Sequence, residues 1–155
     1  MSPRGRRGSV PARVTADGLA TSVGSVCMAN PVITASGTAG HGDEMAAYLD
    51  LASLGAVAVK SLGPRPWPGN PPPRLVPAGA DLLNSVGLQG PGVEAWLEHD
   101  LRALERRGAR VIASIWGERV EDFEAAARML SGAPPCVVAV EVNVSCPNLA
   151  DCPGG

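Results

Sequence analysis

The sequence lacks the features that mark several large classes of protein. Its 155 residues carry 13 basic and 15 acidic side chains, a formal net charge of -2, so no broad positive surface favours nucleic acid as the main partner. No stretch approaches the roughly 18 uninterrupted apolar residues of a membrane span. The arginine-rich residues 1–13 are not followed by the apolar segment of a secretory signal. We therefore expect a cytosolic protein with a disordered basic tail over 1–13 and a small molecule as its partner.

Cysteine and histidine are too few, and too widely spaced, for a metal site or a disulfide framework. No two cysteines form a CxxC pair, and the two histidines, His41 and His99, lie far apart. We expect no metal. Cys27 and Cys136 adjoin apolar segments and are interpreted as buried hydrophobic residues, whereas Cys146 follows an apolar segment among polar residues. Cys146 is therefore the cysteine that the sequence singles out for chemistry.

Apolar segments alternate with segments of helical periodicity along most of the chain. The 45% of hydrophobic residues indicates a buried core. Four segments nearly continuous in Val, Ile and Ala are predicted as strands: 31–37, 56–61, 109–117 and 137–145. Three others are predicted as helices, the first closed by Gly55 as its C-cap: 44–55, 92–108 and 118–132. Apolar strands that alternate with helices form parallel sheets covered by those helices, so the predicted fold class is α/β.

Two connecting segments carry their own signals. Residues 14–31 alternate apolar and polar positions around Asp17 and Gly18, which predicts an N-terminal hairpin turning at that dipeptide. Residues 63–77 hold seven prolines, too many for a regular element, and are predicted as a short ordered loop rather than a linker.

The α/β class leaves two architectures, a doubly wound sheet and a barrel. Gly37, Gly40 and Gly42 have the wrong spacing for the dinucleotide-binding GxGxxG motif, and no GxxxxGK[ST] occurs. Polar residues instead end successive strands, where a (β/α)₈ barrel assembles its active site: Ser36, Lys60, Asn84, Ser114 and Asn143. About four strand and helix units are present, against roughly 250 residues for a whole barrel, so we expect the first half of a TIM barrel over residues 14–155.

Five motifs carry a specific resemblance. "NPVITASGT", "VAVKS", "GNPPPRL", "NSVGLQGPG" and "VEVNVSCPN" occur in the order and approximate spacing of the family-1 dihydroorotate dehydrogenases. The chain resembles the N-terminal half of these FMN-dependent enzymes of pyrimidine biosynthesis. The resemblance implies a (β/α)₈ barrel with FMN at the C-terminal ends of its strands. Dihydropyrimidine dehydrogenases, which reduce uracil or thymine, share several motifs and stay an alternative, as does an inactive fragment.

The resemblance also implies a site. FMN contacts are implied for Ala35, Ser36, Gly37, Lys60, Ser61, Ser114 and Asn143. Ser114 stands where many relatives have asparagine. Substrate contacts are implied for Lys60, Asn84, Ser85, Val86, Gly87, Leu88, Asn143 and Asn148. A lysine ammonium can hold negative charge on orotate and on reduced flavin, and an asparagine amide can pair with an imide ring. Plain turns, or a lysine reaching solvent, are the alternatives for these positions.

Cys146 is implied as the catalytic base. It would take the C5 proton of dihydroorotate while the C6 hydride passes to flavin, since a thiol titrates closer to neutral pH than the other side chains of this loop. An inert thiol in a turn is the alternative. A cysteine base, without an N-terminal amphipathic membrane helix, favours the soluble branch of the family.

The same resemblance suggests partners. "NSVGLQGPG" is most similar to the NAD-linked branch, which implies an electron-transfer subunit with FAD and an iron-sulfur cluster; fumarate is the alternative acceptor. We expect a homo-oligomer for the complete protein. Half a barrel leaves two strand edges and an apolar face open, so the isolated chain should aggregate, dimerise or fold poorly. It should also bind FMN weakly and be inactive.

Overall fold

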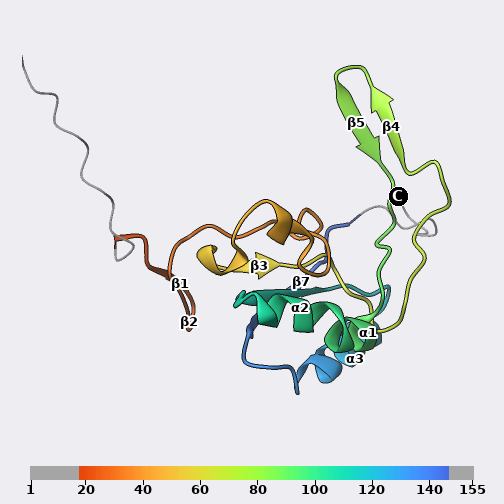
Figure 1. The fold of residues 1–155 in the computed structure, drawn as a ribbon. Coiled ribbons are helices and arrows are strands. Elements are labelled where there is room, and N and C mark those ends of the chain that lie inside the picture. Colours follow the sequence, from red (N-terminus) through yellow and green to blue (C-terminus); the bar gives the residue numbers. More distant parts are fainter. Residues whose placement is uncertain (1–17, 147–155) are drawn as a thin grey trace, which may run out of the picture.

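A computed structural model describes residues 18–146 and places a parallel sheet at the centre of the chain (Figure 1). Three strands, β3 (Val57–Ala58), β6 (Val111–Ile115) and β7 (Val137–Val142), pair in the order β3-β6-β7. Ile33 forms one further parallel bridge, with Ala56, on the side of β3 away from β6. The strands of this sheet therefore lie side by side in the order in which they occur in the sequence. The predicted α/β class with a parallel sheet is confirmed.

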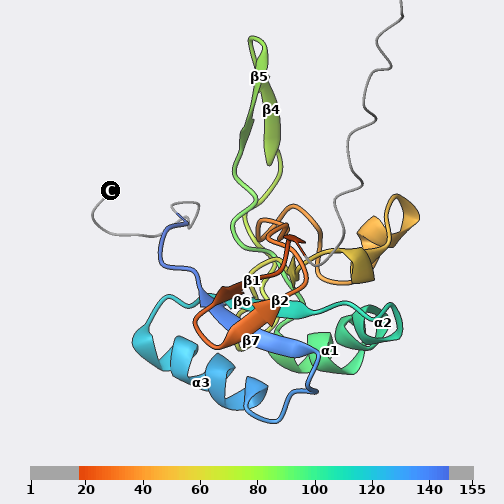
Figure 2. The ribbon, with the colours of Figure 1, turned by 90° about the vertical axis from the view of Figure 1, so that its left-hand side faces the viewer.

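Three helices cover one face of this sheet (Figure 2). They are α1 (Val93–Glu98), α2 (Asp100–Arg106) and α3 (Val120–Leu130). The single helix predicted over 92–108 is thus divided at His99, whose backbone leaves helical geometry at φ -117° and ψ -67°. Its predicted apolar face still packs inward, because Trp96, Leu101 and Leu104 are buried in the core.

The sheet alternates between a helix-covered face and an opposite face. Val111, Ala113 and Ile115 belong to the core under the helices, so Ile112 and Ser114 point to the opposite face. By register, Ala139 and Glu141 of β7 share that face. On the helix side, Val140 is 45% and Val142 is 55% exposed, because no helix within residues 18–146 covers that end of β7.

The strand predicted over 31–37 is wrong in extent. Only the bridge of Ile33 is present, and Val32 and Ile33 are exposed rather than buried. Among the described residues, no strand pairs with this segment on the side away from β3. The segment therefore lacks a neighbour that would bury its side chains and add backbone hydrogen bonds.

The helix predicted over 44–55 is also wrong. Two separate 3₁₀ turns, Glu44–Ala47 and Leu51–Ser53, replace it. Asp50 has extended backbone, and its carboxylate accepts the N–H of Ala52 at 3.1 Å, which starts a new turn instead of continuing the old one. Gly55 is not a helix C-cap: a Cβ there would lie 2.1 Å from the carbonyl oxygen of Asn30, so the glycine allows close backbone approach.

Two hairpins flank the sheet. A hairpin is present as β1 (Thr21–Val23) and β2 (Val26–Met28), and it turns at Gly24, with φ +57°. Asp17, where the sequence predicted the turn, lies outside the described residues. A second hairpin, β4 (Leu75–Ala78) with β5 (Asp81–Asn84), projects from the body (Figure 1). The prediction of no regular element up to Pro77 is therefore wrong, since Pro77 lies in β4. Both strands of a two-stranded hairpin are edges, where proline is tolerated.

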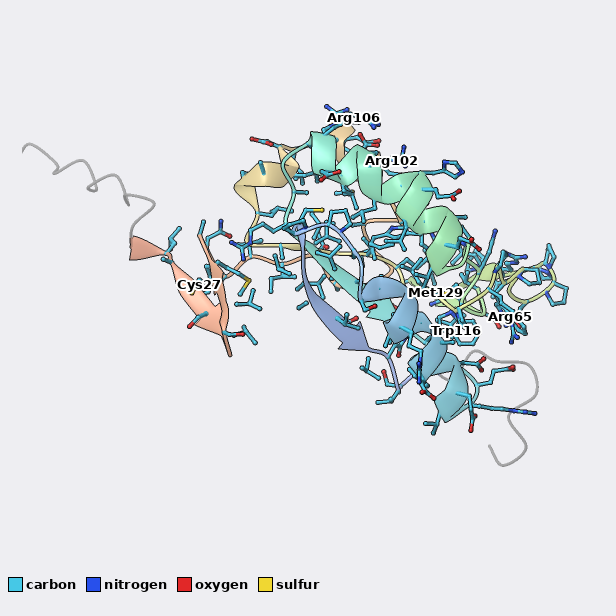
Figure 3. All side chains as sticks on the ribbon, turned by 90° about the horizontal axis from the view of Figure 1, so that it is seen from below. Cys27, Arg65, Arg102, Arg106, Trp116 and Met129 are labelled. Atoms are coloured by element: carbon cyan, nitrogen blue, oxygen red, sulfur yellow. The ribbon has the colours of Figure 1, made fainter. Side chains whose placement is uncertain are left out.

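The cysteines differ from one another in burial. Cys27 lies on β2 and is exposed, so its predicted burial is wrong (Figure 3). Cys136 is half-buried against the core, and burial, with the nearby Glu105 carboxylate, raises the pKa of its thiol. Within residues 18–146 no group of three His, Cys, Asp or Glu side chains is arranged to hold a metal ion. No helix in that range has the length and apolarity needed to cross a membrane.

Candidate functional site

One pocket of about 340 Å³ lies where the carboxyl ends of the strands meet the β4–β5 hairpin. Its lining brings together residues from four separate stretches of sequence. The lining residues are Ser36, Gly37, Thr38, Lys60, Ser61, Asn84, Val86, Gly87, Leu88, Asn143 and Cys146. Thr38 was not singled out from the sequence; its hydroxyl donates to the Ala35 carbonyl oxygen at 2.6 Å and closes the turn that carries Ser36.

Three described residues expected at the site do not line the pocket. Ala35 lies in the turn and accepts hydrogen bonds from Thr38. Ser85 faces Asn70, whose Nδ2 donates to its Oγ at 2.9 Å. Ser114 is completely buried, one layer behind Ser61. Asn148, expected to contact substrate, lies outside the described residues.

An irregularity at the end of β3 turns two consecutive side chains toward the pocket. Ala58 pairs with Ile112 but Leu62 pairs with Ile115, so three residues of one strand face two of the other. The backbone N–H of Lys60 leaves the ladder and donates to the Gly40 carbonyl oxygen at 2.9 Å. Such bulges redirect side chains near functional sites, and here Lys60 and Ser61 both line the pocket although neighbours in a regular strand point to opposite faces.

A chain of hydrogen bonds crosses the three strands beneath the pocket. Asn143 Nδ2 donates to Ser61 Oγ at 3.0 Å, and Ser61 Oγ lies 2.9 Å from Ser114 Oγ. Asn143 Oδ1 accepts the backbone N–H of Ser145 at 3.2 Å. Asn143, which directly follows β7, is therefore bonded both to Ser61 in the segment after β3 and to the loop that carries Cys146.

Lys60 gives the pocket an uncompensated positive charge. Burial, and then the cation of Arg74, lower the pKa of its ammonium. Among residues 18–146 no carboxylate forms an ion pair with it. A half-buried cation without an anionic neighbour is stabilised by an anionic ligand, so this end of the pocket favours a carboxylate or another negative group.

His41 lies beside this charge, behind the lining. Burial, and then Lys60, lower the pKa of its imidazole, while the Asp100 and Glu44 carboxylates act in the opposite direction. The His41 carbonyl oxygen accepts the indole N–H of the buried Trp96 at 2.8 Å. The helix layer is thereby joined to the segment that supports Lys60.

The loop Asn84–Leu88 is held in an unusual backbone conformation. Gly87 has φ +72° and Leu88 has φ 58°, a left-handed geometry that a leucine rarely adopts. Asn70 fixes this loop through its backbone N–H to the Val86 carbonyl oxygen at 3.1 Å and its side-chain amide to Ser85. The Trp67 indole N–H donates to the Gly87 carbonyl oxygen at 3.0 Å.

These anchoring residues were missed by sequence reasoning. Trp67, Asn70 and Arg74 all lie in the proline-rich segment, which was predicted only as a loop. Arg74 donates to the Pro68 carbonyl oxygen at 3.0 Å and to the side chain of Gln89, so it joins both ends of the hairpin. The polar and aromatic side chains among the prolines were the available signal. Such side chains can form hydrogen bonds to another segment, whereas glycine and proline have no side-chain donors or acceptors.

Comparison with known proteins places these residues in a family. The family model described as dihydroorotate dehydrogenase matches residues 18–154. Relatives named "Dihydroorotate dehydrogenase B (NAD(+)), catalytic subunit" include that of Desulforudis audaxviator, 48% identical over 130 residues, which cover 84% of this chain and 42% of the relative. That of Thermoanaerobacter pseudethanolicus is 46% identical over 131 residues, covering 84% and 43%.

A third relative of the same name, from Alkaliphilus metalliredigens, is 43% identical over 127 residues, covering 82% of this chain and 41% of the relative. The chain thus spans about two fifths of the length of these relatives. The resemblance expected from the five motifs is confirmed, and the chain belongs to the dihydroorotate dehydrogenase family.

Proposed function

We propose that this chain supplies part of the active site of an enzyme that oxidises dihydroorotate to orotate in pyrimidine biosynthesis, with FMN as cofactor. The observation that carries the proposal is the meeting of Lys60, Asn143 and Cys146 in one pocket. A cation, an amide and a thiol are the groups that an anionic imide substrate and its deprotonation require. The names of the three relatives favour dihydroorotate over the alternative of uracil or thymine.

The residues present fit the FMN that this family uses. A Cβ added at Gly37, with φ +87°, would meet no atom within 4 Å, so the turn leaves open space beside the pocket for a flat ring to approach. Ser36, Lys60, Ser61 and Asn143 present hydroxyl, ammonium and amide groups around that space. When bound, FMN would supply the acceptor for the hydride that leaves C6.

The polar lining also fits the substrate. We assign the carboxylate of orotate to Lys60, since its charge has no carboxylate partner in the described part of the chain. Asn84 and Asn143 would pair with the imide edge of the ring, bordered by the backbone of Val86, Gly87 and Leu88. The proposal also includes a substrate contact for Asn148. Ser85 would act on the substrate through the conformation of the loop Asn84–Leu88.

In the proposed reaction, the Cys146 thiolate takes the proton from C5 and becomes a thiol. The C5–H electron pair then forms the C5–C6 double bond, and C6 loses its hydrogen with two electrons as hydride. Lys60 holds the substrate carboxylate and thereby fixes C5 relative to Cys146. Asn143, held by Ser61 and by the Ser145 N–H, keeps the ring edge in register with the loop.

We further propose that the sheet is part of a (β/α)₈ barrel completed by further residues of the whole protein. Supporting this, strands are added in chain order in one direction, whereas a doubly wound sheet reverses direction at its ligand site. The exposure of Val140 and Val142 on the helix side of β7 also fits a missing helix layer. We place the complete enzyme in the cytoplasm as a homo-oligomer with an FAD and iron-sulfur subunit that passes electrons to NAD.

The test uses a fusion of residues 1–155 to the C-terminal remainder of the Desulforudis audaxviator relative, called the completed protein below. The proposal predicts a yellow protein absorbing at about 450 nm whose flavin spectrum changes on addition of orotate. Uracil, which lacks the carboxylate, should bind far more weakly, and Lys60→Met should abolish the difference. Equal binding of uracil and orotate by the wild type would contradict the assignment of the substrate, and a colourless protein would contradict that of the cofactor.

A further inference from the structure

We propose that Ser114 is a positioning residue that acts through Ser61 on Asn143 and on the loop of Cys146, and that it does not touch the cofactor. The inference rests on the proposed function and deepens it, because it assigns a different role to a position that the resemblance places among the FMN contacts. The observations that carry it are the burial of Ser114, the bulge in the segment paired with it and a chain of three hydrogen bonds.

Burial separates Ser114 from the pocket. Its side chain has no exposed surface, and it does not line the pocket, whereas Ser61, 3% exposed, does. After the bulge that follows Ala58, Ser61 faces the pocket, and its Oγ lies 2.9 Å from Ser114 Oγ. A ligand in the pocket therefore meets Ser61 first, and Ser114 reaches it only through the Ser61 hydroxyl.

The direction of two of the hydrogen bonds follows from the one group that can only donate. The Ser145 backbone N–H donates to Asn143 Oδ1 at 3.2 Å, which fixes the amide so that Nδ2 faces Ser61 at 3.0 Å. Ser61 Oγ accepts that N–H and also shares a hydrogen bond with Ser114 Oγ, 2.9 Å away, in which either hydroxyl can donate. The bond to Ser114 holds the Ser61 hydroxyl in place beside the Asn143 amide.

Removing the Ser114 hydroxyl changes the loop without touching the ligand. In Ser114→Ala the Ser61 hydroxyl loses this partner, and its hydrogen can rotate toward Asn143, where it competes with the Nδ2 donor. The amide then has two orientations, and in one of them Oδ1 no longer accepts the Ser145 N–H. The loop from Asn143 to Cys146 would lose one of its anchors and become more mobile.

The experiment measures the loop directly, in the completed protein. Alkylation of Cys146 by iodoacetamide is followed by peptide mass spectrometry at fixed pH, with the half-buried Cys136 as an internal report of folding. We expect Ser114→Ala to alkylate Cys146 roughly fivefold faster than the wild type, the factor typical of one lost hydrogen bond. Ser61→Ala should do the same, and the double variant should be no faster than the faster single variant, because the residues act in series.

Two further comparisons separate positioning from other roles. Ser131→Ala removes a surface hydroxyl that bonds only to the Arg128 carbonyl oxygen at 2.7 Å, and it should leave the rate unchanged. If Ser114→Ala also makes Cys136 reactive, Ser114→Thr and Ser114→Val are compared instead. Threonine and valine have similar shapes, but only threonine has a hydroxyl. Cys146 should be alkylated more slowly in Ser114→Thr than in Ser114→Val.

The FMN dissociation constant distinguishes a positioning role for Ser114 from direct contact with the cofactor. Positioning predicts an FMN Kd within about twofold of wild type in Ser114→Ala, whereas a direct contact predicts weaker FMN with an unchanged alkylation rate. Additive effects of the two serine variants, or equal rates for Thr and Val, would likewise overturn the inference. Alkylation needs neither substrate nor turnover, so a wild-type protein that ignores orotate would refute the proposed function while the loop measurement still decides the role of Ser114.

Discussion

Gly87→Ala tests whether the pocket-lining loop Asn84–Leu88 depends on its left-handed backbone. An alanine at φ +72° costs about 1–2 kcal/mol relative to glycine. Its Cβ would also lie 2.7 Å from the backbone nitrogen of Asn70, which cannot turn aside as a side chain can, and such overpacking costs about 1–3 kcal/mol. If about 2 kcal/mol of this total falls on the bound loop, the Kd for orotate rises roughly 30-fold.

The matched control is Gly79→Ala at the tip of the same hairpin. Gly79 has φ +68°, but a Cβ there meets nothing within 4 Å, so only the backbone cost remains and it falls far from the pocket. Titration of the completed protein with orotate, monitored by the flavin spectrum, should show the large loss in Gly87→Ala and less than about a twofold change in Gly79→Ala. Equal losses, or none, would refute the reasoning that the Asn70 contact shapes the site.

Variants at three further positions probe the charges and the proposed base. Cys146→Ala should slow flavin reduction by dihydroorotate roughly 100-fold or more in stopped flow at neutral pH, while Cys146→Ser should keep some activity only at high pH; an unchanged rate would remove the cysteine from its role. Lys60→Met should weaken orotate binding yet raise the melting temperature, because burial and Arg74 lower the pKa of Lys60 and thus penalise its charged form at neutral pH; a lower melting temperature would contradict this. His41 has its pKa lowered in the fold, so the unfolded chain binds more protons and stability should fall as pH drops through about 6.5. Melting curves between pH 8 and about pH 5.5 should show that His41→Phe loses this dependence. Asp100, whose pKa is raised, acts with the opposite sign in both proteins, so the difference between the two curves reports on His41.

The sequence allowed the grouping of the proposed site residues to be predicted, because parallel strands place their carboxyl ends at one edge of the sheet. Lys60, Asn143 and Cys146 each follow an apolar segment, and the structure brings them into one pocket. The other expected site residues that line the pocket also lie near strand ends, so their grouping was predictable for the same reason. Ser114 shows the limit, since it also ends a strand but is buried behind Ser61.

What could not be predicted depends on contacts between distant segments. The bulge that turns Lys60 and Ser61 to the same side exists only in the pairing of β3 with β6, which composition does not encode. The helical spacing of 44–55 was overridden locally by the capping side chain of Asp50. The β4–β5 hairpin went unpredicted because the prolines outweighed the few apolar residues of its short strands, although Pro77 occupies an edge.

Anaerobic mixing of the completed protein with dihydroorotate tests the central claim most directly. The account predicts that absorbance at about 450 nm is lost as hydride leaves the substrate, that orotate is formed in equal amount, and that Cys146→Ala does this roughly 100-fold more slowly. A flavin that dithionite bleaches but dihydroorotate leaves oxidised would contradict the claim that this pocket oxidises dihydroorotate.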